Sequence, residues 1–114
     1  MDLINIFKVL SDETRLRIVV LLHQQDLCVC QLTGILDVSQ PKVSKNLSKL
    51  RDMDLVKDER KEKFVYYSLK KDPIILDNIL KNILNNIDNY PQLITDMRHL
   101  QQKDSYLNQC CNNE

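Results

Sequence analysis

Apolar side chains recur three and four residues apart along most of the first fifty positions. This spacing is that of an amphipathic helix, whose apolar stripe repeats about every 3.6 residues. Caps and turn residues divide the stretch into separate helices, because Ser and acidic residues favour helix starts. The pattern predicts helices over residues 2–10, from Ser11 as N-cap to about His23, over Val29–Leu36, and from Ser39 as N-cap to about Arg51.

The pattern changes after residue 54. Residues 55–59 and 63–69 are short and rich in Val, Phe and Tyr, and the charged residues Arg60–Glu62 lie between them. Such a pair of segments predicts a β-hairpin. Four helices followed by a charged hairpin are typical of a winged helix-turn-helix, which is mainly α with a β-hairpin wing (α+β).

A second long apolar stripe follows Pro73 and consists of Ile75, Leu76, Ile79, Leu80, Ile83, Leu84 and Ile87. It predicts a strongly amphipathic helix, which Pro91 ends or kinks before a further helix to about Gln102. A chain of this size is too small to bury the whole stripe by itself. Together with the apolar face of residues 2–10, the stripe predicts a homodimer joined through the first and C-terminal helices.

The length of 114 residues suits one domain, which we expect over residues 1–105. The polar residues 106–114, which include Cys110 and Cys111, predict a flexible C-terminal tail. The longest apolar run, Ile18–Leu22, is too short to cross a bilayer, and the N-terminus does not resemble a secretory signal. We therefore expect a cytoplasmic protein with no membrane partner.

Charge is unevenly distributed although the net charge is zero. Residues 39–71 hold ten basic and five acidic side chains, and the segments on both sides have an acidic excess. A basic block of this kind binds a polyanion even in a neutral protein. Between Lys42 and Arg51 there are four basic residues and no acid, all within the expected fourth helix.

A basic helix of this kind fits the major groove of double-stranded DNA. Lys and Ser side chains reach phosphates, and Gln and Asn pair with base edges. A solvated helix face is the alternative for the helix alone, and the preceding turn and the following hairpin favour DNA binding. The expected DNA contacts are Ser39, Gln40, Lys42, Ser44, Lys45, Asn46 and Lys49 on the helix and Arg60, Lys61 and Lys63 on the hairpin.

Three stretches resemble the ArsR/SmtB family of metal-responsive repressors. They are Phe7–Ile18 (FKVLSDETRLRI), Ser39–Leu47 (SQPKVSKNL) and Phe64–Leu69 (FVYYSL). The resemblance runs without a gap from about residue 3 to residue 70. It implies a homodimeric winged-helix repressor that leaves its operator when it binds metal. The chain has neither a Cys in a phosphate-binding loop nor a C-x-x-C beside a βαβ unit, so we expect no enzyme and no organic cofactor.

The segment Leu27–Leu32 (LCVCQL) resembles the thiol motif of the arsenical and cadmium/lead branches of that family. Thiolates are soft ligands that thiophilic ions prefer. We therefore expect Cys28 and Cys30 to bind As(III) or Sb(III) as the inducer. The third cysteine of the arsenical pattern is replaced by Thr33, so Cys110 or Cys111 is the candidate third ligand.

Three alternatives stay open for the cysteines. They are ordinary small buried residues, ligands of Cd(II) or Pb(II), or the thiols of a redox-sensing winged-helix repressor. A zinc site is not expected. Asp96 and His99 are the nearest candidate pair, and two ligands do not make a zinc site, so we expect both residues at the surface.

Overall fold

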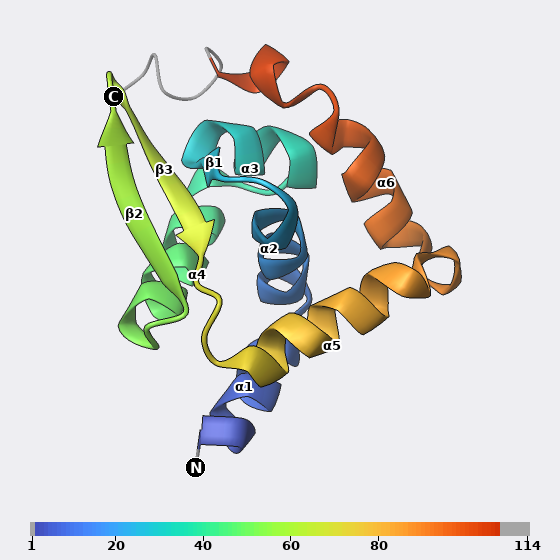
Figure 1. Cartoon of the computed structure of the whole chain (residues 1–114). Helices are drawn as coiled ribbons and strands as arrows, with labels where there is room; N and C mark the ends of the chain where they lie inside the picture. The colour runs from blue at the N-terminus through green and yellow to red at the C-terminus, as the bar shows by residue number, and fades with distance from the viewer. Residues whose placement is uncertain (1, 108–114) are drawn as a thin grey trace.

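The main helices and the hairpin follow one another along the chain in the expected order (Figure 1). The computed structural model describes residues 2–107. Within them the elements are α1 (Asp2–Leu10), α2 (Glu13–Gln24), β1 (Leu27–Cys28), α3 (Val29–Leu36), α4 (Gln40–Asp52), β2 (Val56–Lys61), β3 (Phe64–Leu69), α5 (Ile74–Asn85), η1 (Ile87–Asn89), α6 (Pro91–Leu100) and η2 (Lys103–Tyr106).

Helix α2 lies in the middle of the fold, and α1, α3, α4, α5, α6 and strand β3 all pack against it (Figure 1). Its residues Ile18–Leu21 are fully buried, and so is Leu27 just beyond its end. A helix that is apolar on all sides is typical of a core position. The run of five apolar residues in the sequence therefore marks the centre of the fold.

The start of α2 differs from the sequence prediction by one residue. Asp12, and not Ser11, is the N-cap, because its carboxylate accepts a hydrogen bond from the backbone N–H of Arg15 at 3.0 Å. The Ser11 hydroxyl instead donates to the carbonyl of Lys8 at 2.7 Å and so helps to close α1. The N–H of Arg15 also holds the pKa of Asp12 below its ordinary value.

The helix-turn-helix consists of α3, a short turn and α4. Asp37 ends α3 in the left-handed conformation (φ 55°), which Asp tolerates better than most residues. The prediction that Ser39 caps α4 is confirmed: its hydroxyl accepts from the N–H of Lys42 at 3.4 Å, and Pro41 stands in the first turn. Both helix boundaries are within a residue of those expected from the sequence.

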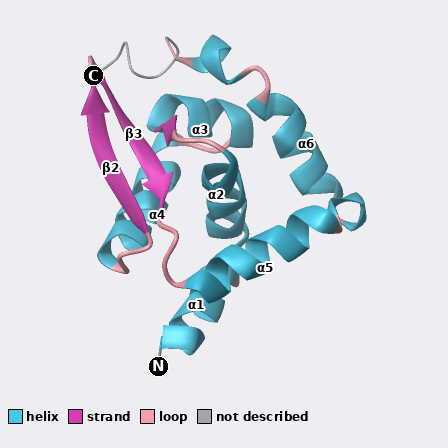
Figure 2. Ribbon diagram, in the orientation of Figure 1, coloured by secondary structure: helices cyan, strands magenta, loops and turns pink. Residues whose placement is uncertain are grey.

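The wing is an antiparallel hairpin of β2 and β3 with a turn at Glu62 and Lys63 (Figure 2). Strand β2 extends two residues beyond the expected end, since Arg60 and Lys61 pair with β3 and do not belong to the turn, and β3 starts one residue later than expected, at Phe64. A third strand, β1, is absent from the sequence prediction. It has two residues, Leu27 and Cys28, which pair with Tyr67 and Tyr66 of β3.

The C-terminal part of the chain forms more helical segments than expected. Helix α5 ends at Asn85, the 3-10 turn η1 follows, and α6 starts at Pro91. The 3-10 helix η2 then packs on α3, with the ring of Tyr106 so close to Gly34 that an added Cβ would lie 2.2 Å from it. Cys110 and Cys111 of the expected tail lie outside the described residues.

Two helices leave apolar side chains in contact with solvent. On α5 only Leu76 and Leu80 are buried, whereas Ile74 is 69% exposed. On α1, Phe7 is 53% exposed and Ile4 48%. Among residues 2–107 no helix combines the length and hydrophobicity that crossing a membrane requires.

Candidate nucleic-acid interface and thiol site

Helix α4 has one face in the core and one in solvent. Val43, Leu47 and Leu50 are buried. On the other side Lys42, Lys45 and Lys49 are exposed, together with Ser39 and Ser48, while Gln40 and Ser44 are half-buried. The exposed face holds no carboxylate before Asp52, so it presents positive charge and hydroxyl groups to an approaching polyanion.

Asn46 differs from the other residues expected to contact DNA. It is only 6% exposed, and both ends of its amide have partners within the protein. Its Nδ2 donates to the carbonyl of Lys42 at 2.9 Å, and its Oδ1 accepts from Nη1 of Arg15 at 3.2 Å. The amide is therefore used inside the fold and is not presented to a base edge.

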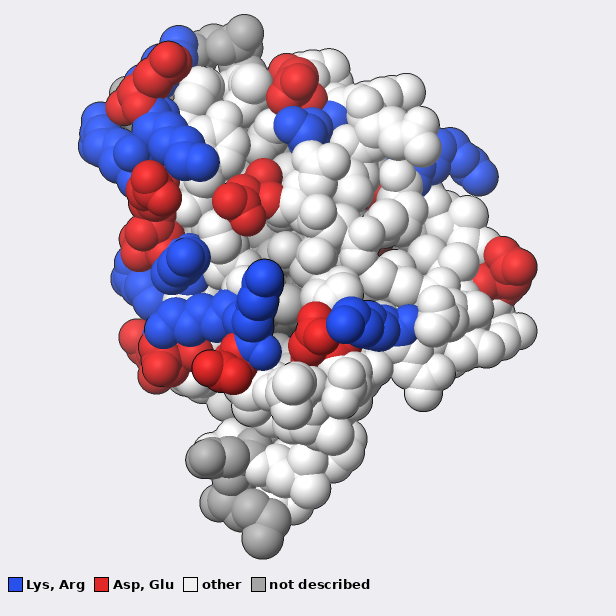
Figure 3. All heavy atoms as spheres, viewed as in Figure 1, with Lys and Arg blue, Asp and Glu red and all other residues white. Residues whose placement is uncertain are grey.

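The wing adds a second group of cations close to its turn. Arg60, Lys61 and Lys63 are exposed, and Nε of Arg60 donates to the carbonyl of Glu62 at 3.3 Å. Basic side chains gather on the side of the molecule that carries the hairpin and α4, with acids among them (Figure 3). Arg51 of α4 pairs with Asp58 of β2 at 3.2 Å, which connects the wing to the helix.

The thiol site consists of Cys28 and Cys30 with the aromatic rings of Phe64 and Tyr66 against them. Both cysteines are 1% exposed, and Leu107 packs on the same cluster. The two rings meet edge to face, with centroids 6.3 Å apart. Residues 64 and 66 lie on one face of β3, since side chains alternate along a strand.

The thiol site also contacts the cations of the wing. Nζ of Lys61 lies 5.8 Å from the ring centroid of Tyr66, and Nζ of Lys63 lies 5.5 Å from that of Phe64. Burial raises the pKa of Tyr66 above its ordinary value. The same two rings therefore belong to the cluster of the cysteines and also approach two of the expected DNA-binding lysines.

Cys28 belongs to two elements at once, because it ends β1 and is the N-cap of α3. Its backbone N–H donates to Oε1 of Gln31 at 3.1 Å, and Nε2 of Gln31 donates to Asp104 of η2 at 3.3 Å. Cys28 carries a free thiol, while Cys30 is disulfide-bonded. Within residues 2–107 no three His, Cys, Asp or Glu side chains form a metal-binding group.

Asp96 and His99 are not the surface residues expected from the sequence. Asp96 is 1% exposed and binds Arg17 in a bidentate pair, at 2.8 Å to Nε and 2.9 Å to Nη2. This pair raises the pKa of Arg17. His99 contacts the carbonyl of Ile35 at 3.2 Å. Asp96 could have been recognised as buried, because it shares a helical face with the apolar Leu93 and Leu100.

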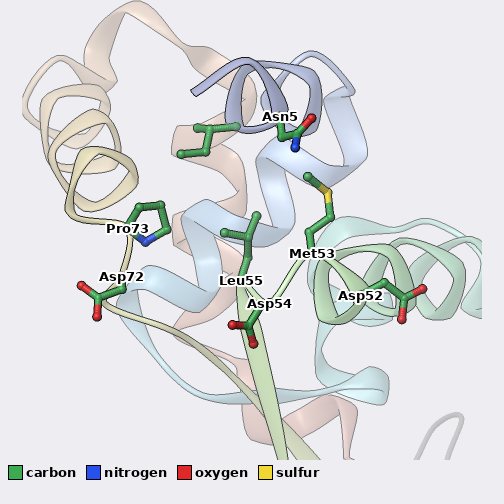
Figure 4. Close-up of a pocket in the computed structure, with 8 residues that line it drawn as sticks. Asn5, Asp52, Met53, Asp54, Leu55, Asp72 and Pro73 are labelled. Carbon is green, nitrogen blue, oxygen red and sulfur yellow. The ribbon is translucent and has the colours of Figure 1, made fainter. Parts of the chain in front are cut away.

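An open cavity of about 520 Å³ lies between α1, the end of α4 and the turn before α5 (Figure 4). Asp52, Asp54 and Asp72 line it, but their carboxylates point in different directions (Figure 4). Asp54 pairs with Lys70. The cavity therefore lacks the converging ligands of a metal site, and it lies apart from the thiol site.

Comparison with known proteins places this arrangement in a family. The model of the bacterial regulatory protein arsR family matches residues 12–58. Over 87 residues the chain is 34% identical to the transcriptional repressor SdpR of Bacillus subtilis. These aligned residues are 75% of this chain and 96% of SdpR. The chain belongs to the ArsR family. The resemblance seen in the sequence is thereby confirmed, and so is the winged helix-turn-helix.

Other ArsR-family members are similar over shorter stretches. The arsenic resistance transcriptional regulator ArsR1 of Pseudomonas putida is 42% identical over 82 residues, which are 70% of this chain and 64% of ArsR1. The arsenical resistance operon repressor of Escherichia coli is 51% identical over 67 residues, which are 58% of this chain and 57% of that repressor. The chain thus spans less than two thirds of these two relatives.

Two solved structures of the same fold are also similar. HlyU from Vibrio cholerae has a TM-score of 0.66 and 26% identity, covering 72% of this chain and 87% of HlyU. The antimony-specific transcriptional repressor AntR has a TM-score of 0.64 and 26% identity, covering 79% of this chain and 80% of AntR.

Proposed function

We propose that this ArsR-family protein is a metalloid-responsive transcriptional repressor. It binds operator DNA as a homodimer and leaves the DNA when As(III) or Sb(III) binds Cys28 and Cys30. One observation carries the proposal: the thiol site lies at the start of α3, which packs directly on the helix with the acid-free cationic face. The names of ArsR1, of the arsenical operon repressor and of AntR support the choice of ligand.

Helix α4 enters the major groove in this proposal. Lys42, Lys45 and Lys49 neutralise phosphates, and Gln40 reads a base edge at the N-terminal end of the helix, where recognition helices approach the bases. Ser39 and Ser44 donate hydroxyl groups to the backbone. The wing contacts the adjacent phosphates through Arg60, Lys61 and Lys63.

The exposed apolar faces of α1 and α5 form the dimer contact. Phe7 and Ile74 are more than half exposed in the single chain, and Leu3, Ile4 and Ile75 extend the same apolar surface. Burying them against a second copy removes this area from water, which favours association. Two-fold symmetry then places the two α4 helices about one helical turn (~34 Å) apart on the DNA.

Metalloid binding disturbs the start of α3. Cys28 is the extended N-cap of α3 and Cys30 stands in the first turn of the helix, so the two thiols leave stretches of backbone with different conformations. Two thiolates converge on one ion only if this first turn changes shape. Because Cys28 also pairs with Tyr66 of β3, the change reaches the wing as well as α4. The ion therefore binds the DNA-free conformation better than the DNA-bound one, and the DNA is released.

A third sulfur comes from Cys110 or Cys111 in this proposal. Leu107 packs at the thiol site, and Cys110 follows three residues later. Three residues of extended chain span at most about 10 Å, which is sufficient to bring a thiolate to the ion. Each of these two cysteines contributes less to As(III) affinity than Cys28 or Cys30 does, since either of the two can replace the other.

The test is a fluorescence-anisotropy titration of the reduced protein–DNA complex with As(III), Sb(III), Cd(II) and Zn(II). Cys28→Ser and Cys30→Ser should each bind DNA like the wild type and lose release by As(III). The double substitution Cys110→Ser and Cys111→Ser should lower As(III) affinity only partly. If either single variant still releases DNA at the wild-type As(III) concentration, the proposed ligands are wrong. If Cd(II) releases the DNA at lower concentration than As(III), the inducer is Cd(II) and not As(III).

Thr33 offers a matched control on the same helix. Its buried hydroxyl has no hydrogen-bond partner within the described part of the chain, so Thr33→Val should bind DNA and respond to As(III) like the wild type. Thr33→Cys adds a thiol one turn after Cys30 and should tighten As(III) binding. Loss of the response in Thr33→Val would show that any change in α3 blocks release.

A redox-sensing repressor is the second candidate, and the disulfide bond of Cys30 favours it. In this case a mild oxidant releases the DNA without metalloid, and a reductant restores binding. Mass spectrometry of the oxidised protein identifies the bridge. Oxidant-driven release that persists in Cys30→Ser excludes the Cys30 disulfide as the switch, and a wild-type protein that keeps its DNA under mild oxidation excludes this function.

A further inference from the structure

Arg15 connects three segments of the chain through one guanidinium group. Its Nη1 donates to Oδ1 of Asn46 at 3.2 Å. Its Nε donates to the carbonyl of Val9 at 3.2 Å, and its Nη2 lies 3.4 Å from the carbonyl of Lys8. Arg15 itself stands in the first turn of α2, so its side chain joins the end of α1 to the middle of α4.

The partners of Arg15 at the end of α1 are backbone carbonyls, of which that of Lys8 also accepts from the Ser11 hydroxyl. The last four carbonyls of a helix have no partner within it, and Lys8 and Val9 are among the last residues of α1. A guanidinium satisfies two such carbonyls together, because its N–H groups are fixed in one plane. Lysine, with its single ammonium group, does not reproduce this geometry.

The partner of Arg15 on α4 is held from both sides. Asn46 donates to the carbonyl of Lys42, one turn earlier in the same helix, and accepts from Arg15. With 6% exposure, Asn46 has little access to water that could replace either bond. A shift of α4 relative to α1 therefore breaks this part-buried hydrogen bond and leaves the buried Asn46 oxygen without its donor, which is costly.

We propose that Arg15 is a positioning residue for DNA recognition, which sets the orientation of α4 relative to α1. The inference rests on the proposed DNA-binding function. Since the exposed apolar face of α1 forms the dimer contact in that proposal, Arg15 also relates the dimer axis to each recognition helix. A correct orientation of α4 matters most for base contacts, because hydrogen bonds to base edges tolerate less change in distance and angle than contacts to phosphates.

Direct contact between Arg15 and a DNA phosphate is the competing role, because a guanidinium has more donors than these three bonds use. The two roles differ in salt dependence. Each lost phosphate contact lowers the slope of log affinity against log salt by about one. Loss of positioning leaves the slope unchanged and lowers the preference for a specific sequence.

The experiment compares two DNA probes of equal length: a duplex that the wild-type protein enriches from a random-sequence library, and a random duplex. Arg15→Lys should bind the enriched duplex about 10-fold more weakly, as expected for a lost charged hydrogen bond, and the random duplex nearly as well as the wild type. The salt slope should stay that of the wild type. Asn46→Ala should show the same loss of affinity for the enriched duplex and the same unchanged salt slope. The double variant should lose no more affinity for the enriched duplex than the weaker-binding single variant.

Two control variants separate positioning from general effects. Arg98→Lys, on the exposed side of α6, should bind both probes like the wild type. Asp12→Asn weakens the cap of α2 without removing the Arg15–Asn46 bond and should keep the sequence preference. If Arg15→Lys does not fold, Asn46→Ala supplies the same measurements.

Three results overturn the inference. If Arg15→Lys prefers the enriched duplex over the random duplex as strongly as the wild type does, Arg15 has no positioning role. If Arg15→Lys binds both duplexes equally more weakly and with a lower salt slope, Arg15 contacts a phosphate. An equal loss of preference in Asp12→Asn reduces the role of Arg15 to general stability. If the wild-type protein enriches no sequence at all, the proposed function fails and the inference fails with it.

Discussion

The ion pair between Arg17 and Asp96 allows a quantitative prediction about stability. The pair is buried, with side-chain exposures of 9% and 1%, and it joins α2 to α6. Nη2 of Arg17 also donates to the carbonyl of Leu36 at 2.9 Å, at the end of α3 and next to the turn before α4. Gln92 donates to Asp96 at 3.1 Å. The pair therefore helps to hold the helix-turn-helix against the C-terminal helix.

The perturbation is Asp96→Asn, which removes the negative charge and keeps the size of the side chain. Arg17 then remains buried and charged without a carboxylate, and its acceptors are the Leu36 carbonyl and the single amide oxygen of the substituted side chain. Breaking a buried pair by removing one member costs about 3–5 kcal/mol, and the remaining carbonyl bond favours the lower value. A loss of about 3 kcal/mol from a domain of this size corresponds to a melting temperature lower by roughly 12 °C.

The assay is urea unfolding followed by circular dichroism at one fixed protein concentration, because dimerisation makes stability concentration-dependent. Arg51→Gln is the matched control: the Arg51–Asp58 pair has side-chain exposures of 49% and 38%, so its loss should cost less than about 1 kcal/mol. Replacing both partners, Arg17→Met with Asp96→Leu, should restore most of the stability. If Asp96→Asn costs no more than Arg51→Gln, the pair does not stabilise the fold as argued.

Three further predictions concern DNA binding, assembly and pH. Lys45→Ala with Lys49→Ala should weaken all DNA sequences alike and lower the salt slope by about two, and an unchanged slope in anisotropy titrations would show that α4 does not face DNA. Ile74→Asp should split the dimer and leave the chain folded, because Ile74 is 69% exposed in the single chain, and sedimentation showing a folded, stable dimer would remove α5 from the interface. Hydrogen bonds from His23 and Lys81 hold the pKa of Asp77 below 3.8. Asp77 therefore stabilises the fold above that pH and loses this effect as the pH falls through its lowered pKa, so Asp77→Asn should destabilise the protein at about pH 5 and become neutral in strong acid.

The helices and the hairpin could be predicted from the sequence because their signals are local. The period of apolar residues marks each helix, and Ser39 with Pro41 marks the start of α4 within one residue. The pair Cys28 and Cys30 was visible for the same reason, since both lie in one short motif. The family resemblance rested on such local stretches, and the comparisons confirm it.

The tertiary structure decided the features that depend on residues far apart in the chain. Strand β1 has only two residues and no pattern of its own, and it exists because β3 supplies its hydrogen-bond partners. Packing of η2 on α3 depends on the space beside Gly34, which Tyr106 fills from the other end of the sequence. Local periodicity contains no information about such pairings.

The same distinction explains the polar residues that the sequence alone placed incorrectly or left undecided. From the sequence, Asn46 is one of several polar residues on a basic helix, and Asp96 is a charged residue expected in solvent. Arginines from α2 change both assignments: Arg15 holds the Asn46 amide and Arg17 holds the Asp96 carboxylate in the interior. The sequence by itself thus determined the elements, the cationic face of α4 and the thiol pair. Only the tertiary structure decided which polar groups face inward, because burial of a polar group depends on a partner that folding brings to it.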